Sequence, residues 1–207
     1  MKKQNGQSLP RFETLLPGLL LWMICFAGAV PPAAAENQEK PGCLNDVCFE
    51  TVKDINGAAV PLRGIGLLEF LSVDLYTAAF YVPAEADTLE KVLGDTPKSL
   101  VIEYHHGIKV KWMNEAAEKT LKKNPGVNFP AIEERVRQIA AAYKKVDKND
   151  RYELCYEPGR GTSLYLNGEV QITLPGQDFA AAYFGIWISD YPARDKLRDQ
   201  LLNLSAG

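Results

Sequence analysis

The chain has 207 residues, enough for one domain or for one domain with an appendage. Apolar residues make up 46% of it and charged residues 24%, the balance of a globular protein rather than a disordered one. A net charge of −3 argues against nucleic acid as a partner, because neutralising phosphates requires a basic surface. Four cysteines exclude a dense disulfide scaffold, and two histidines leave little for a zinc site. We expect no metal and no cofactor.

The first 35 residues have the pattern of a secretory signal peptide. Lys2, Lys3 and Arg11 supply positive charge, and the run Leu15–Val30 then carries no charge over 16 residues. A membrane-spanning helix needs about 20 apolar residues, so this run is short for an anchor. We therefore expect cleavage after Ala35, a periplasmic or secreted product, and no stable membrane anchor. An uncleaved signal anchor is the alternative.

Three cysteines remain after the expected cleavage. Cys43 and Cys48 lie close together in the sequence, and an exported protein meets oxidising conditions, so this pair is the candidate for a disulfide. Two independent thiols are the alternative. Cys155 falls within a strand pattern and is expected to be a small buried hydrophobic residue.

The expected product begins with a polar arm and a first strand over residues 36–56, and one domain follows over 57–203. Alternating apolar residues and the turn pairs Asn56-Gly57 and Asn167-Gly168 predict a series of strands. In chain order these strands cover Val47–Lys53, Ala58–Arg63, Gly64–Leu71, Val73–Val82, Lys98–His106, Arg151–Tyr156, Thr162–Leu166 and Val170–Leu174.

Helices are predicted in two groups by apolar residues that recur with a helical period. They cover Thr88–Leu93 with Asp87 as its cap, Met113–Lys122, Ile132–Tyr143, Phe179–Ile188 and Ala193–Leu202. Strands and helices do not alternate regularly along the chain. The order predicts an α+β fold, with helices packed on one face of a largely antiparallel sheet.

Motifs for common enzyme chemistries are missing from the sequence. It has no glycine loop between a strand and a helix for phosphate, and no Gly-x-Ser-x-Gly elbow of a serine hydrolase. His105 and His106 are adjacent in a predicted strand, so their side chains should point to opposite faces and cannot share a metal ion. Asp74 interrupts an apolar strand, and we expect it to face solvent.

Aromatic residues crowd the predicted elements. They are Tyr76, Phe80, Tyr81, Tyr104, Trp112, Tyr143, Tyr152, Tyr156, Tyr183, Phe184 and Trp187. Large aromatic side chains dominate the cores of small domains, so most of these are expected in the core. A subset could line a cleft for an apolar ligand between the sheet and the helices.

Six short motifs follow one another along residues 57–203. They are Gly64-x-Gly66, the strand Leu75–Pro83, Asn149–Tyr152, Tyr156-x-Pro158-Gly159-x-Gly161-Thr162, Asn167-Gly168, and Phe179 leading to Gly185-Ile186-Trp187. In this order they resemble the chalcone isomerase-like family, in particular its short exported bacterial members. The resemblance implies an open-faced β-sandwich, in which a large antiparallel sheet carries helices on one face and a ligand cleft lies between.

The resemblance also implies which site residues to look for. In plant relatives that are enzymes, an arginine after the glycine pair holds the reacting phenolate, and fatty-acid-binding relatives use a similarly placed arginine for the carboxylate. Here that position holds Leu68 or, one register away, Glu69, and Trp112 stands where a plant tyrosine would be. Because an oxyanion site needs donors that these residues lack, we do not expect flavonoid cyclisation.

The leading hypothesis is a non-catalytic periplasmic protein that binds an apolar or amphipathic small molecule, such as a fatty acid, in the sheet–helix cleft. We expect it to be a monomer. The basic residues nearest the strand motifs are Arg63, Arg151 and Arg160, and Arg63 is the first choice as the partner for a carboxylate. The pocket candidates, each of which has an ordinary core role as its alternative, are Leu68, Tyr76, Phe80, Trp112 and Trp187.

Two other hypotheses stay open. One is an isomerase or lyase of the chalcone isomerase type on an unknown substrate, with Tyr76 or Asp74 as acid or base. The other is an interaction module of the cell envelope that presents its sheet or the Ala193–Leu202 helix to a partner.

Overall fold

The computed structural model describes residues 42–204. The predicted signal peptide over 1–35 and the start of the polar arm lie outside these residues. Among the residues from 42 to 204, no helix is both long and apolar enough to cross a bilayer.

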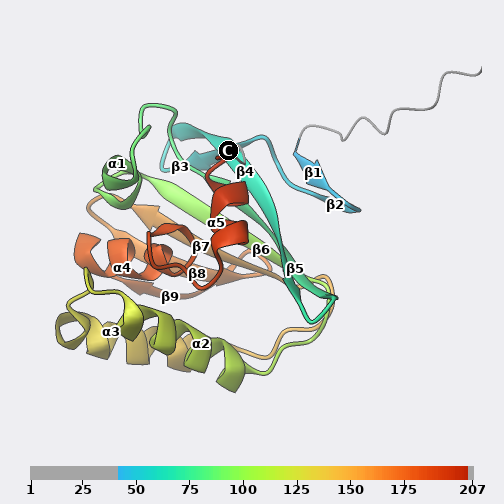
Figure 1. The fold of residues 1–207 in the computed structure, drawn as a ribbon. Helices are drawn as coiled ribbons and strands as arrows, with labels where there is room; N and C mark the ends of the chain where they lie inside the picture. The colour runs from blue at the N-terminus through green and yellow to red at the C-terminus, as the bar shows by residue number, and fades with distance from the viewer. Residues whose placement is uncertain (1–41, 205–207) are drawn as a thin grey trace, which may run out of the picture. The chain divides into compact units, whose positions relative to one another are not determined.

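A seven-stranded antiparallel sheet forms the centre of the fold (Figure 1). Each strand pairs with the next one in the chain, so the sheet is a meander. The strands are β3 (Val52–Ile55), β4 (Ala58–Phe70), β5 (Val73–Tyr81), β6 (Lys98–Tyr104), β7 (Arg151–Glu157), β8 (Gly161–Leu166) and β9 (Glu169–Leu174). With the helices described below, this sheet confirms the predicted α+β class.

Three two-residue turns connect neighbouring strands of the meander. Asn56-Gly57 and Asn167-Gly168 both adopt positive φ angles, as the hairpin pattern predicts. Leu71 and Ser72 do the same between β4 and β5, with φ angles of 50° and 61°, although neither residue type favours that conformation. The two strands predicted over 58–71 are one continuous strand, β4, with an irregularity in its register between Leu62 and Gly64.

Five helices accompany the sheet. They are α1 (Leu89–Leu93), α2 (Val110–Lys123), α3 (Phe129–Ala142), α4 (Gln177–Ile188) and α5 (Asp195–Leu201). Helix α4 is apolar around nearly its whole circumference and packs against all four other helices, which explains why it is buried. Thr88 caps α1 by accepting a hydrogen bond from the Lys91 amide, so the prediction of Asp87 as the cap is wrong.

The two faces of the sheet carry different layers. On β6, Lys98, Leu100, Ile102 and Tyr104 point to the helices, and the residues between them point to the opposite face. The helix-covered face holds the larger core cluster. On the other face a smaller cluster includes Val47 and Phe49 from the N-terminal segment, Val101 and Cys155. Cys155 is therefore buried, and it is a free thiol.

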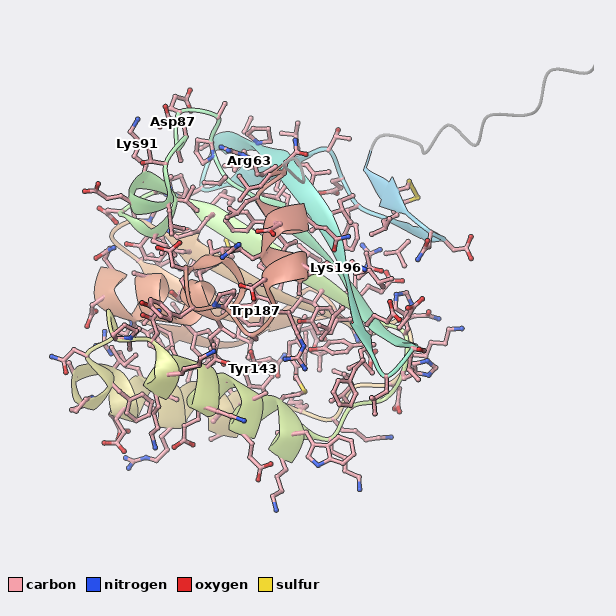
Figure 2. All side chains as sticks on the ribbon, viewed as in Figure 1. Arg63, Asp87, Lys91, Tyr143, Trp187 and Lys196 are labelled. Atoms are coloured by element: carbon pink, nitrogen blue, oxygen red, sulfur yellow. A yellow bond between two sulfur atoms is a disulfide. The ribbon has the colours of Figure 1, made fainter. Side chains whose placement is uncertain are left out.

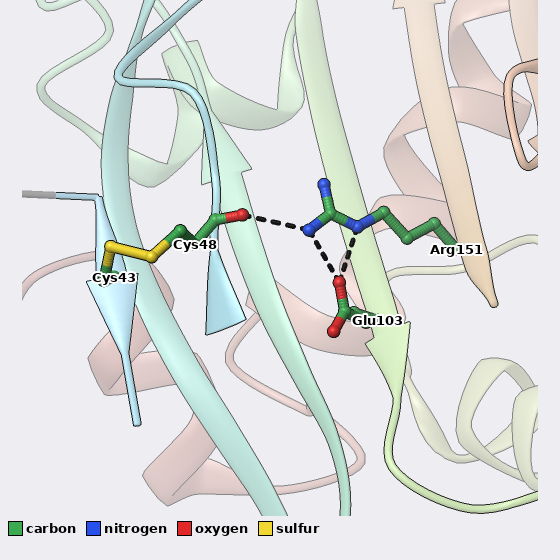
Figure 3. The surroundings of a disulfide bond; sticks show 4 residues. All are labelled: Cys43, Cys48, Glu103 and Arg151. Atoms are coloured by element: carbon green, nitrogen blue, oxygen red, sulfur yellow. Dashed lines mark hydrogen bonds and ion pairs between the residues drawn. A yellow bond between two sulfur atoms is a disulfide. The ribbon is translucent and has the colours of Figure 1, made fainter. Parts of the chain in front are cut away.

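The N-terminal segment is fastened to the second face of the sheet by a disulfide hairpin and an arginine (Figure 3). Strands β1 (Cys43–Leu44) and β2 (Val47–Cys48) pair with each other, and the two cysteines are bonded. The Arg151 guanidinium donates to the Cys48 carbonyl over 2.9 Å and to the Glu103 carboxylate over 2.6 Å. The predicted strand over 47–53 is thus divided between β2 and β3.

Candidate ligand-binding site

A cavity of about 550 Å³ lies between the sheet and helices α2, α4 and α5. This volume is within the range of about 300–1,000 Å³ typical of small-molecule sites. Its walls are largely aliphatic and aromatic, which suits an apolar ligand. The aliphatic and methionine side chains of the wall are Leu68, Leu75, Leu100, Ile102, Ile108, Met113, Ala116, Ala117, Leu154, Leu164, Ile186, Ala193 and Leu197.

Four of the five pocket candidates line this cavity. Leu68 and Tyr76 come from β4 and β5, Trp112 from the first turn of α2, and Trp187 from α4. Trp112 is 61% exposed, so it stands at the edge of the cavity. Phe80 is fully buried and is not part of the lining; its ring packs against Phe184 with centroids 6.5 Å apart.

Arg63 does not line the cavity. Its guanidinium donates to the backbone carbonyls of Ala86 over 3.0 Å and Pro83 over 3.3 Å, which ties β4 to the segment before α1. Figure 2 shows Arg63 well apart from Tyr143 and Trp187.

Arg194 lines the cavity, and no other charged residue among residues 42–204 does. It was not among the residues predicted from the sequence. It is exposed at the N-terminal end of α5, and its guanidinium lies 5.9 Å from the ring centroid of Phe70. The guanidinium also donates to the carbonyl of Ala193, and it forms no ion pair with a carboxylate of residues 42–204. The sequence signal for it was weak: a basic residue just after the break at Pro192.

The glycine pair Gly64-x-Gly66 allows α5 to reach this position. A Cβ atom on Gly64 would lie 2.3 Å from the backbone oxygen of Gln200, and one on Gly66 would lie 2.7 Å from Leu197. The side chain of Gln200 accepts a hydrogen bond from the Leu67 amide, which joins the helix to the strand. Helix α5 therefore lies directly on β4, with Arg194 at the cavity.

Five tyrosines bring hydroxyl groups to the lining: Tyr76, Tyr104, Tyr143, Tyr152 and Tyr183. The Trp187 indole N–H donates to the Tyr76 hydroxyl over 3.1 Å, and the Tyr183 hydroxyl donates to the Tyr143 hydroxyl over 3.3 Å. These aromatic residues were predicted from the sequence to be core or cavity residues. The sequence does not distinguish the two roles, because both follow the same apolar pattern.

Burial keeps these hydroxyl groups protonated. It raises the pKa of Tyr76 to about 12, although the Trp187 hydrogen bond and the Arg194 charge act in the opposite direction. Burial also raises the pKa of Tyr104 and of Tyr183 well above the usual value of 10.0. Near neutral pH the tyrosines are therefore hydrogen-bond donors, and a base poised for proton transfer would need a pKa close to the working pH.

Of the two acid–base candidates, Tyr76 lines the cavity and Asp74 does not. Asp74 is exposed near the β4–β5 turn, and the cavity lining within residues 42–204 includes no carboxylate and no histidine. His105 and His106 follow β6 rather than lying within it, and the His105 ring is hydrogen-bonded to Thr77 over 2.8 Å. No group of three potential metal-ligating side chains occurs in the described part of the chain. The arrangement is suited to binding a ligand.

A buried lysine marks the opposite end of the helix-covered face. The Lys98 ammonium donates to the carbonyls of Gly94 and Thr96, and it lies 4.5 Å from the ring centroid of Tyr156. Burial lowers the pKa of Lys98 to about 7, and the charge of Asp95 opposes this shift. Lys98 does not line the cavity, so its polar contacts serve the packing of α1.

A family model described as chalcone isomerase-like matches residues 43–203. The chain belongs to the chalcone isomerase-like family. Among solved structures, this chalcone isomerase-like chain is similar to the crystal structure of an Arabidopsis thaliana fatty-acid binding protein, with a TM-score of 0.60 and 15% identity. The match covers 76% of this chain and 92% of the plant protein, and at this identity it shows the fold alone. No sequence among the curated proteins matches the chain.

Proposed function

We propose that this chalcone isomerase-like protein binds an amphipathic carboxylic acid, such as a fatty acid, in the cavity and releases it unchanged. The observation that carries the proposal is an apolar cavity with one guanidinium at its edge. The aliphatic wall contacts the hydrocarbon chain, and the Arg194 guanidinium donates hydrogen bonds to the carboxylate.

The apolar wall supplies most of the affinity in this proposal. Each methylene group removed from water contributes about 0.8 kcal/mol, so a long chain is favoured over a short one. A tyrosine-lined interior without carboxylates has no group that repels an acid. These features support a long-chain ligand whose acid group stays at the entrance.

Arg194 is well placed for the carboxylate because its charge is not used elsewhere among the described residues. A guanidinium binds a carboxylate through two parallel hydrogen bonds. Its exposure at the edge of the cavity limits the cost of removing both charges from water. The Tyr76 hydroxyl is near enough for Arg194 to influence its pKa, so it can act as a further donor.

The fold comparison supports this choice of ligand class. The similar plant structure is described as a fatty-acid binding protein, and it shares the sheet and helical layer over 76% of this chain. In this chain the cavity between sheet and helices is the natural place for the same kind of molecule.

The test compares octadecanoic acid with octadecan-1-ol, which has the same chain and no charge. Dissociation constants are measured by titration calorimetry on the protein purified from full-length expression. We expect the acid to bind about tenfold or more tightly than the alcohol, and Arg194→Gln to remove this difference.

Arg137→Gln is the matched control, because Arg137 is an exposed arginine of α3 away from the cavity. This variant should keep the preference for the acid. The proposal fails if neither ligand binds the wild type, or if Arg194→Gln and Arg137→Gln bind the acid equally well.

We also propose that the protein is exported through a cleavable signal peptide. The charge and apolar pattern of residues 1–35 and the Cys43–Cys48 disulfide support export to an oxidising compartment. Cell fractionation and N-terminal sequencing test this: the expected product is periplasmic or secreted and begins near residue 36. A product that keeps residue 1 and stays in the cytoplasm would contradict it.

A further inference from the structure

The hydrogen atoms of the cavity hydroxyls can be counted from the donors and acceptors around them. The Trp187 indole nitrogen can only donate, so the Tyr76 hydroxyl is the acceptor of their 3.1 Å hydrogen bond and keeps its own hydrogen free. Tyr143 and Tyr183 share one hydrogen bond between two hydroxyls, so one of their two hydrogens remains free whichever group donates.

Tyr104 adds a third free hydrogen. Its side chain is only 4% exposed, and its hydroxyl has no hydrogen-bond partner among residues 42–204. Tyr152, whose ring packs edge-on against that of Tyr104, is different. The Tyr152 hydroxyl accepts a hydrogen bond from the Lys144 amide and donates its hydrogen to the Lys144 carbonyl, so it has no free hydrogen for a ligand.

These three hydroxyls lie in the same part of the cavity. The rings of Tyr76 and Tyr104 pack edge-to-face with centroids 5.7 Å apart. Tyr143 packs in the same way against Tyr152, at 5.0 Å. Tyr76 and Tyr143 both contribute to raising the pKa of Tyr104, as expected for neighbouring hydroxyls. All of these tyrosines line the same cavity, so one ligand can reach their unused donors.

We propose that the ligand carries, besides its carboxylate, an uncharged oxygen acceptor that the Tyr104 and Tyr143 hydroxyls bind, with Tyr76 beside them. This proposal rests on the proposed function and names the ligand class as an oxygenated fatty-acid-like molecule. A carbonyl group fits best, because its two lone pairs can accept from two hydroxyls at once.

The second oxygen is uncharged because no cation accompanies these donors. Among the described residues, Arg194 is the one charged residue of the lining, and the proposed function pairs it with the first carboxylate. A second buried carboxylate would have no positive partner, and an unpaired buried charge is strongly unfavourable. A plain saturated chain would leave the donors of Tyr104 and Tyr143 unpaired in an apolar space.

The test uses octadecanoic acid and a set of its mono-oxo derivatives, with the ketone at successive positions along the chain. Their dissociation constants are measured for the wild type and for the double variant Tyr104→Phe/Tyr143→Phe. We expect at least one ketone position to bind the wild type about tenfold more tightly than octadecanoic acid. The double variant should show no preference for any ketone position, and it should bind octadecanoic acid more tightly than the wild type does, because the donors that a saturated chain leaves unpaired are gone.

Tyr165→Phe is the control, because Tyr165 packs against the core cluster on the other face of the sheet and loses the same hydroxyl group. It should keep the wild-type preference. Circular dichroism in the near ultraviolet verifies that each variant keeps its tertiary packing.

The outcomes separate this inference from the proposed function. If octadecanoic acid binds with dependence on Arg194 and no ketone binds more tightly, the proposed function stands and this inference is overturned, with water as the partner of the hydroxyls. The inference is also overturned if the double variant keeps the preference, or if it loses affinity for octadecanoic acid itself, because the tyrosines would then hold the carboxylate. If no acid binds at all, both proposals fail.

Discussion

The helix-covered face of the sheet is filled at one end and hollow at the other, and strand β6 runs between the two ends. Lys98 begins this strand and Tyr104 ends it, on the same face and about 20 Å apart. At the filled end, the Lys98 ammonium has two carbonyl acceptors and an aromatic ring around it. At the hollow end, the Tyr104 hydroxyl has no partner among the described residues.

The polar group at the filled end serves folding, whereas the polar group at the hollow end is available to a ligand. Both Lys98 and Tyr104 are buried, so burial alone does not distinguish them. What differs is the cavity, which Tyr104 lines and Lys98 does not. A missing hydrogen-bond partner does not by itself mark a group that is available to a ligand. The Thr162 hydroxyl is buried without a partner among the described residues, yet it does not line the cavity.

The largest expected effect is a loss of stability at the filled end. Lys98→Ala removes a fully buried side chain and leaves the carbonyls of Gly94 and Thr96 without their donor. We expect the free energy of unfolding to fall by about 3 kcal/mol, measured by urea denaturation. Lys98→Met keeps the volume but also removes the donor to these carbonyls, so it should lose less than the alanine variant, about 1–2 kcal/mol.

Ligand affinity is the second readout for the Lys98 variants. Since Lys98 does not line the cavity, the dissociation constant for octadecanoic acid should stay at the wild-type value in both variants. If a folded Lys98→Met protein binds the acid much more weakly, Lys98 contributes to ligand binding and the two ends are not independent.

Displacing α5 should affect both stability and binding. Gly64→Ala places a Cβ atom against the backbone oxygens of Gln200 and Leu201, so the helix has to move. We expect the free energy of unfolding to fall by about 2 kcal/mol. Octadecanoic acid should also bind more weakly, because Arg194 moves with α5.

The matched control for this displacement is Gly185→Ala in α4. A Cβ atom there would only make ordinary contact with Ser189, at 3.4 Å. This variant should keep wild-type stability and affinity. Equal effects of the two substitutions on binding would mean that the position of α5 does not matter.

Stability should rise with pH because of Lys98. In the unfolded chain the lysine keeps its proton up to its ordinary pKa of 10.5, whereas burial lowers the folded pKa to about 7. Between these values the unfolded state binds more protons, so raising the pH favours the folded state. We expect the free energy of unfolding to gain about 1 kcal/mol per pH unit between about pH 7 and pH 9.

The Lys98→Met variant isolates this contribution, since the methionine does not titrate. Urea denaturation across the same pH range should show a clearly smaller slope for the variant. Identical slopes for the variant and the wild type would assign the pH dependence to other groups.

The smallest expected effect is at the hollow end. Tyr104→Phe removes a hydroxyl that has no hydrogen-bond partner among residues 42–204, so the free energy of unfolding should stay the same or rise by less than about 1 kcal/mol. Tyr152→Phe removes two hydrogen bonds to Lys144 and should lower it by about 1–2 kcal/mol. Thermal denaturation of the two variants side by side checks the difference, and equal destabilisation would contradict it.

Local sequence patterns predicted much of the fold. The turn pairs Asn56-Gly57 and Asn167-Gly168 form hairpins because they favour positive φ angles, and the apolar run of α4 is buried because it has almost no polar face. The break between β4 and β5 was placed within one residue, at Ser72, but no turn was recognised there, since neither Leu71 nor Ser72 favours its backbone conformation. Propensity predicts turns only where the local chain determines them.

The site depended on contacts between distant segments, which the sequence shows less clearly. Tyr76 and Trp187 were selected from an aromatic pattern and do line the cavity, but the same pattern selected Phe80, which is core. Arg63 was chosen because it is near the strand motifs in the sequence, and Arg194 was not considered. Only the packing of α5 on β4 shows that Arg194 is the arginine at the cavity.

The central claim is that Arg194 and the apolar cavity hold an amphipathic acid, and a crystal structure of the protein with octadecanoic acid tests it most directly. We predict electron density for the chain between Leu68, Met113 and Trp187, with the carboxylate in hydrogen-bonding distance of the Arg194 guanidinium. An acid bound outside this cavity, or a carboxylate held by other residues while Arg194 makes no contact with it, would contradict the account.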